Sequence, residues 1–251
     1  MRFRAKTIAI LLVVLHGPFY VASVVLLRQA GDVSWPTLLL SRLWNSSSLD
    51  ALPRSSQIWI AGSTLSGLFG EMLFAVALAA LMRGWLEGRD PSAGDVIRRT
   101  LRRLPGILLV WIVALVIKAI GAALCLVGLL LVVPQLSILA PVVAFEGSGS
   151  FRMLSALGRS RQLANRSASR ALFLTLMAPA LSALVSWGIS AGDQLGITRF
   201  EQLSTIMGIA ASLLLVVARG ATMTLLYLDI RVRTEGLDLA IRAPEALGPL
   251  R

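Results

Sequence analysis

Cysteine, histidine and charged residues are all scarce in this chain of 251 residues, and each scarcity excludes a class of protein. The only cysteine is Cys125 and the only histidine is His16, and both lie inside apolar runs. This excludes a disulfide-stabilised fold and the usual zinc sites, so no cofactor or metal is expected. Charged residues make up 15% of the chain and hydrophobic residues 56%, which excludes an ordinary soluble domain.

Catalytic motifs are also missing from the sequence. It contains no nucleophile elbow, no glycine-rich phosphate loop with a lysine, and no pair of intramembrane carboxylates for acid–base work. His16 has no serine in a motif context that would indicate an intramembrane protease. The sequence therefore predicts a protein that is not an enzyme.

Long apolar runs dominate the chain instead, and a helix needs about 20 apolar residues to cross a bilayer. Residues 107–145 form one apolar stretch interrupted only by Lys118, too long for one straight helix, so we predict a hairpin that turns between Gly121 and Gly128. The first run is too long for a signal peptide and is interpreted as an anchor, kinked at Gly17-Pro18. The predicted fold is an all-α transmembrane bundle in one integral membrane domain, with segments at about 7–27, 59–82, 107–123, 126–145, 171–189 and 203–230, and a tail at 231–251.

The positive charges predict how this bundle is oriented. Of the 24 Lys and Arg residues, 18 lie before the first segment, in 83–106, in 146–170 and in the tail, whereas the loops on the other side hold 4. Cytoplasmic loops of membrane proteins carry the excess of Lys and Arg. Both termini are therefore expected in the cytoplasm of a bacterium, with the protein in the inner membrane. The net charge of +11 is read as attraction to anionic lipid and not to nucleic acid.

Two of the basic segments are predicted to form amphipathic helices at the cytoplasmic surface. In the first, Ser92 and Asp95 have the spacing of a capping box, and Ile97, Leu101 and Leu104 share one face. Such helices lie among lipid headgroups or dock on an acidic partner, and the sequence leaves both open. The arginines expected to make these contacts are Arg98, Arg99, Arg102 and Arg103 in the first segment and Arg152 and Arg166 in the second.

Three ionisable residues fall well inside the apolar runs: Glu71, Lys118 and Arg219. Charges inside a membrane are costly and are usually paired or functional. They are interpreted either as a structural network that fixes the packing of the helices or as the lining of a polar pathway.

The last apolar run ends in a dense set of opposite charges, "YLDIRVRTEGLD". If the helix continues, residues four apart are neighbours, so Asp229 pairs with Arg233 and Arg231 with Glu235. Glu146, at the end of the fourth run, is a further candidate partner for Arg231 or Arg233.

These same residues carry a resemblance to a known family. "APVVAFEGSGSFRMLSALGRSRQL" and "LLYLDIRVRTEGLDL" resemble the bacterial superfamily that includes the glycerophosphoryl diester phosphodiesterase membrane domain and YciC-like proteins. The match covers roughly residues 80–240. Its motif positions here are Glu146, Arg159, Tyr227, Asp229, Arg231, Arg233, Glu235 and Asp238. The resemblance implies a membrane domain without the catalytic domain fused to some members, and so no phosphodiesterase activity.

Two functions remain open from the sequence. The first is a non-enzymatic scaffold or accessory subunit, whose basic face binds anionic lipid and a protein partner. The alternative is a small transporter or permease that uses the intramembrane charges.

Overall fold

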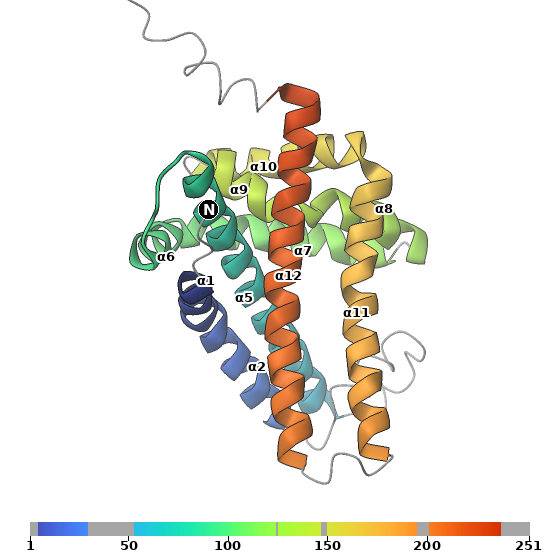
Figure 1. Ribbon diagram of the computed structural model, residues 1–251. Coiled ribbons are helices and arrows are strands. Elements are labelled where there is room, and N and C mark those ends of the chain that lie inside the picture. The colour runs from blue at the N-terminus through green and yellow to red at the C-terminus, as the bar shows by residue number, and fades with distance from the viewer. Residues whose placement is uncertain (1–4, 30–52, 124, 147–149, 195–200, 237–251) are drawn as a thin grey trace, which may run out of the picture.

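The structure is a computed structural model that describes residues 5–29, 53–123, 125–146, 150–194 and 201–236. Every regular element within these ranges is a helix, so the predicted all-α fold is confirmed. In chain order they are α1 (Ala5–Leu11), the π-helical turn η1 (Leu12–His16), α2 (Gly17–Gln29), α5 (Arg54–Leu86), α6 (Ala93–Arg102), α7 (Leu104–Ala123), α8 (Cys125–Ser137), α9 (Leu139–Glu146), α10 (Ser150–Arg166), α11 (Ala168–Gln194) and α12 (Glu201–Glu235) (Figure 1).

Four helical spans are long and apolar enough to cross a membrane: Ala5–Gln29, Arg54–Leu86, Leu104–Ala123 and Ile206–Glu235. By this criterion the chain is a membrane protein. The fourth and fifth predicted segments give shorter apolar helices within the described residues, Leu130–Glu146 and Ala168–Met177. The total of six therefore stays a prediction.

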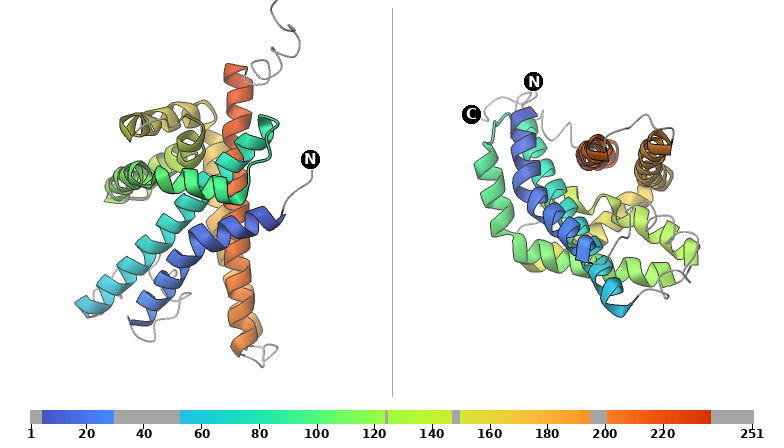
Figure 2. Two further views of the ribbon diagram at one scale, coloured as in Figure 1. Left: turned by 90° about the vertical axis from the view of Figure 1, so that its left-hand side faces the viewer. Right: turned by 90° about the horizontal axis from the view of Figure 1, so that it is seen from below.

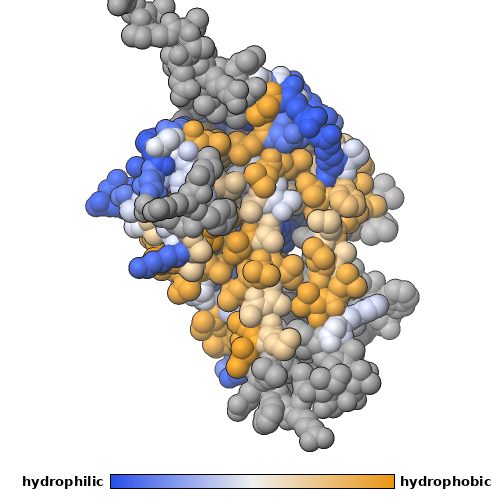
Figure 3. Space-filling view, viewed as in Figure 1, coloured by the Kyte–Doolittle hydropathy of each residue, from blue (hydrophilic) through white to orange (hydrophobic). Residues whose placement is uncertain are grey.

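Exposed apolar side chains cover the outside of these helices. Leu214 is 71% exposed and Val13 and Ile58 are each 67% exposed. Figure 3 shows apolar surface over much of the described molecule, with hydrophilic side chains concentrated toward its upper end. Such a surface is unfavourable in water and matches lipid tails.

The first span contains a distortion next to Pro18. The Gly17 amide donates to the Leu12 carbonyl, five residues back, and Leu12–His16 form a π-helical turn. Because proline has no amide hydrogen, the regular α-helical bonding is interrupted at this point. His16 ends the turn and is 3% exposed, and its Nδ1 has no hydrogen-bond partner among the described residues.

Small residues allow α2 and α5 to pack closely. A Cβ atom on Gly70 would lie only 2.7 Å from Phe19 Cβ, and Ser23 and Ser63 share a hydrogen bond of 3.1 Å between their hydroxyls. Ser66 Oγ also donates to the Phe19 carbonyl at 3.0 Å. Close approach of small residues is a common basis of helix packing in membranes.

The hairpin between α7 and α8 is present, and its helices run across the molecule. A Cβ atom on Gly121 would lie 3.1 Å from the Gly128 carbonyl oxygen, so the two helices touch at this end. Both run transverse to α11 and α12 (Figures 1 and 2), whereas parallel spans were expected. Pro134 lies inside α8, and the helical run breaks between Ser137 and Leu139. The break comes one turn before Pro141, which has no amide hydrogen to donate to the Ser137 carbonyl.

The helix α6 begins as predicted, but only part of its expected apolar face is buried. Ser92 Oγ accepts a hydrogen bond from the Asp95 amide at 3.1 Å, which is the expected N-cap. Val96 and Thr100 are each 3% exposed, and Ile97 is half-buried against the same apolar cluster as Val96. Leu101, from the expected apolar face, is 49% exposed. The reason is tertiary, because α6 packs against α1, α5 and α7.

Candidate functional site

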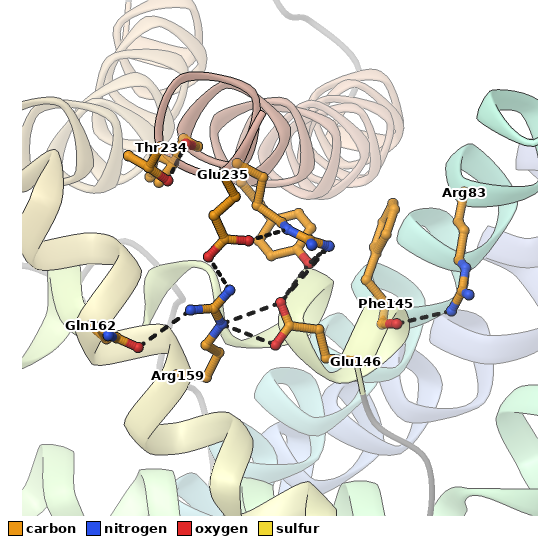
Figure 4. A network of polar contacts seen from close by, with 10 residues as sticks. Arg83, Phe145, Glu146, Arg159, Gln162, Thr234 and Glu235 are labelled. Atoms are coloured by element: carbon orange, nitrogen blue, oxygen red, sulfur yellow. Dashed lines mark hydrogen bonds and ion pairs between the residues drawn. The ribbon is translucent and has the colours of Figure 1, made fainter. Parts of the chain in front are cut away.

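A network of five polar side chains joins the C-terminal ends of α9 and α12 to the middle of α10, and we call it the arginine–glutamate network. It consists of Glu146, Arg159, Tyr227, Arg231 and Glu235. Glu146, the last residue of α9, lies at its centre (Figure 4). Arg159 Nε donates to Glu146 Oε2 at 3.1 Å, and the Tyr227 hydroxyl donates to Glu146 Oε1 at 3.0 Å. A carboxylate at a helix C-terminus is unfavourable in the field of the helix dipole, and the surrounding cations offset this.

Glu235, at the end of α12, closes the network. Arg231 Nε donates to Glu235 Oε2 at 2.8 Å, and Arg159 Nη2 donates to Glu235 Oε1. The side chains of the four charged residues are only 22–28% exposed. Arg159 therefore bridges two carboxylates from different helices in a largely desolvated position, where charge-assisted hydrogen bonds are strong.

Tyr227 connects the network to the hydrophobic core. Its side chain is fully buried, and its ring centre lies 5.1 Å from that of Phe145. Its hydroxyl donates to Glu146 and accepts from Arg231 Nη1 at 3.2 Å. The same residue therefore packs in the core and carries the hydrogen bonds that connect α9 with α12.

Arg83 connects α5 to the C-terminal end of α9, next to the network. Its Nη1 donates to the Phe145 carbonyl at 2.9 Å (Figure 4), and its Nε donates to Glu87 at 2.8 Å. The Phe145 carbonyl is at the C-terminal end of α9, where it lacks a partner within the helix. The sequence analysis missed Arg83, and no motif could have found it because its acceptor is a backbone atom.

Ser160 holds α10 against the break in α8. It is fully buried, and its hydroxyl donates to the Gln135 carbonyl at 2.7 Å. The Gln135 carbonyl lies in the last turn of α8, where carbonyls commonly accept bonds from outside the helix. The neighbouring residues Arg159 and Ser160 therefore anchor α10 to two different elements.

The charge of Arg159 is held by its surroundings. Burial lowers the pKa of its guanidinium, but the hydrogen bonds and negative charges of Glu235 and Glu146 outweigh this and raise the pKa above the usual value. Arg159 therefore stays a cation, and its charge is neutralised within the protein by Glu146 and Glu235.

Both predicted pairs in the C-terminal turns of α12 are present. Arg233 Nε donates to Asp229 at 2.7 Å, and the second pair is Arg231 with Glu235. The sequence did not indicate that Arg170, from α11, also binds Asp229, at 2.9 Å. Of the two candidates for Glu146, Arg231 is the nearer, at 4.0 Å. Asp238 lies outside the described residues.

The arginines expected to contact lipid or a partner differ in their surroundings. The α6 set, Arg98, Arg99, Arg102 and Arg103, is exposed, and no hydrogen bond or ion pair to it is found among the described residues. Arg166 is also exposed, on α10. The side chain of Arg152 lies outside the described residues.

The three intramembrane charges come together at one cavity. Arg219 Nη1 donates to Glu71 Oε2 at 3.0 Å, and Lys118 lines the same cavity, whose volume is about 130 Å³. The sequence placed these residues inside the membrane but gave no indication that α5, α7 and α12 would bring them together.

Comparison with known proteins gives no further information about these sites. No protein-family model, no curated protein and no solved structure matches the chain. Among the described residues there is also no group of three or more His, Cys, Asp and Glu residues that could hold a metal ion.

Proposed function

We propose that the protein is a non-enzymatic scaffold or accessory subunit of the bacterial inner membrane. Its charged end, made of α6, α10 and the last turns of α12, faces the cytoplasm in this proposal. The observation that carries it is the contrast between two sets of arginines. Those of the arginine–glutamate network neutralise internal carboxylates, whereas the four of α6 remain exposed.

The helix α6 has the properties of a fixed docking surface. Its N-cap, the buried Val96 and Thr100, and its packing on α1, α5 and α7 support a rigid attachment to the rest of the molecule. Four positive charges held in this way are complementary to anionic headgroups and to an acidic protein surface. Pre-organised charges lose less freedom on binding than charges on a mobile segment.

A charge reversal with a matched control tests this proposal. The protein is purified from its native membrane in mild detergent, and stoichiometric partners are quantified by mass spectrometry. The double variant Arg98→Glu/Arg99→Glu should reduce partner recovery by about tenfold or more, since each reversed contact becomes repulsive. The variant Arg28→Glu/Arg54→Glu makes the same change in charge at exposed positions in the last turn of α2 and at the start of α5, and it should retain the partner.

Two results would contradict the docking surface. One is equal recovery of the partner by both variants, and the other is a wild-type protein that purifies alone. Either result would favour the second candidate function, a small transporter.

That second candidate is a small transporter, favoured by the shared cavity of Glu71, Lys118 and Arg219. In reconstituted vesicles, Glu71→Gln should then fold normally but lose flux. Unaltered flux would remove Glu71 from such a pathway.

We also propose membership of the superfamily of the glycerophosphoryl diester phosphodiesterase membrane domain and YciC-like proteins. The support is that Glu146, Arg159, Tyr227, Arg231 and Glu235, all positions of the resembling motif, contact one another.

A further inference from the structure

The intramembrane cavity lies where α5, α7, α8, α9, α11 and α12 meet. Its charged residues come from α5, α7 and α12, and its walls are mostly apolar. Figure 3 shows a hydrophilic spot in a hollow between the apolar surfaces of α12 and α11. The residues that matter for its chemistry are Glu71, Trp111, Lys118, Thr175 and Arg219. At about 130 Å³, the cavity is well above the ~10–15 Å³ that one water needs, and it has room for a tetrahedral oxyanion.

The charges around this cavity do not balance. Arg219 and Glu71 pair with each other at 3.0 Å, but no hydrogen bond or ion pair to Lys118 Nζ is found among the described residues. The described residues that line the cavity include one acid and two bases, which together give a net formal charge of +1. A cation in an apolar setting is costly unless an anion accompanies it.

We propose that the cavity binds the phosphate group of an anionic membrane lipid, with Lys118 and Arg219 as its cationic ligands. Phosphate is the shared chemistry of a lipid headgroup and of free inorganic phosphate. The surroundings favour the lipid, because neighbouring helices expose long apolar side chains that match acyl chains. Among them are Val116 and Ile120 on α7, at 51% and 58% exposed, and Leu214 on α12, at 71%. This site is separate from the docking surface proposed on α6, and it does not depend on that surface.

Lipid-dependent stabilisation of the full-length protein tests the inference. The thermal unfolding midpoint in detergent micelles is measured with phosphatidylglycerol, with phosphatidylcholine and with inorganic phosphate. The expected result is a larger rise with phosphatidylglycerol than with phosphatidylcholine, because the choline cation offsets the charge of the same phosphodiester. A rise of the same size with inorganic phosphate would keep the phosphate site but overturn the lipid as its source.

The chain offers a matched control because it has only two lysines, Lys6 and Lys118. Lys118→Met should weaken phosphatidylglycerol binding by about tenfold or more, since it removes a charge-assisted hydrogen bond. Lys6 is exposed on α1, so Lys6→Met should leave binding unchanged. Equal binding by the two variants would overturn the site.

Glu71→Gln is expected to change lipid binding in the opposite direction from Lys118→Met. Among the described residues that line the cavity, Glu71 is the only one with a negative charge. Its removal also frees Arg219, so the variant should strengthen phosphatidylglycerol binding severalfold. If the three charges are only a structural network, the same variant weakens the fold and does not strengthen lipid binding, and this result would overturn the proposal. Glu71→Gln retains both cations. It therefore also tests whether the cavity binds the lipid phosphate if Lys118→Met does not fold.

Discussion

Replacing Tyr227 with alanine should lower the free energy of unfolding by about 3–5 kcal/mol, the range for truncating a fully buried aromatic residue. The side chain is 0% exposed and its ring packs 5.1 Å from that of Phe145. Truncation leaves a cavity and also removes the hydroxyl that lies between Glu146 and Arg231. Titration of the purified protein with a denaturing detergent in mixed micelles measures this loss.

The phenylalanine variant separates these two contributions. Tyr227→Phe keeps the ring and removes only the hydroxyl, so a loss of about 1–2 kcal/mol is expected. Tyr20 is the only other tyrosine, and no hydrogen bond of its hydroxyl is found among the described residues. Tyr20→Phe should therefore change stability by less than about 0.5 kcal/mol. If Tyr227→Phe is as neutral as Tyr20→Phe, the hydroxyl does not connect α9 with α12 as described.

The second large effect is expected at Glu146. Changing it to glutamine removes the charge that faces Arg159 and Arg231 and should cost about 2–3 kcal/mol. Breaking a fully buried ion pair costs roughly 3–5 kcal/mol, and the value is discounted here because the Glu146 side chain is 28% exposed.

Asp229→Asn is the matched control for this variant. Asp229 also binds two arginines, Arg170 and Arg233, but its side chain is 38% exposed and those of the arginines are 52% and 60% exposed. Exposed pairs of this kind contribute about 1 kcal/mol or less. Equal losses in Glu146→Gln and Asp229→Asn would mean that the network is no more than surface charge.

Local pairings were predictable from the sequence because helical geometry alone determines them. The pairs Asp229–Arg233 and Arg231–Glu235 follow from four-residue spacing in α12, and the Ser92–Asp95 cap follows from the start of α6. The hairpin of α7 and α8 followed in the same way from the length of one apolar stretch.

Contacts between distant helices were not predictable from spacing. Arg159 was expected on a helix at the cytoplasmic surface, and it instead bridges Glu146 and Glu235, which is 76 residues away. The amphipathic pattern also did not indicate that Val96 and Thr100 of α6 would be buried, because the packing of α6 on α1, α5 and α7 determines this. Nor does apolar length reveal direction, so the transverse course of α7 and α8 could not be read from composition.

In the arrangement that we propose, α5 crosses the membrane and α6 lies on the cytoplasmic side. Labelling of single cysteines in spheroplasts with an impermeant maleimide tests this directly, in a Cys125→Ala background that removes the only native cysteine. The test positions are Ser55, exposed at the start of α5, and Arg99, exposed on α6. The account predicts that Ser55→Cys reacts in intact spheroplasts and that Arg99→Cys reacts only after lysis. The reverse pattern, or reaction of both positions before lysis, would contradict it.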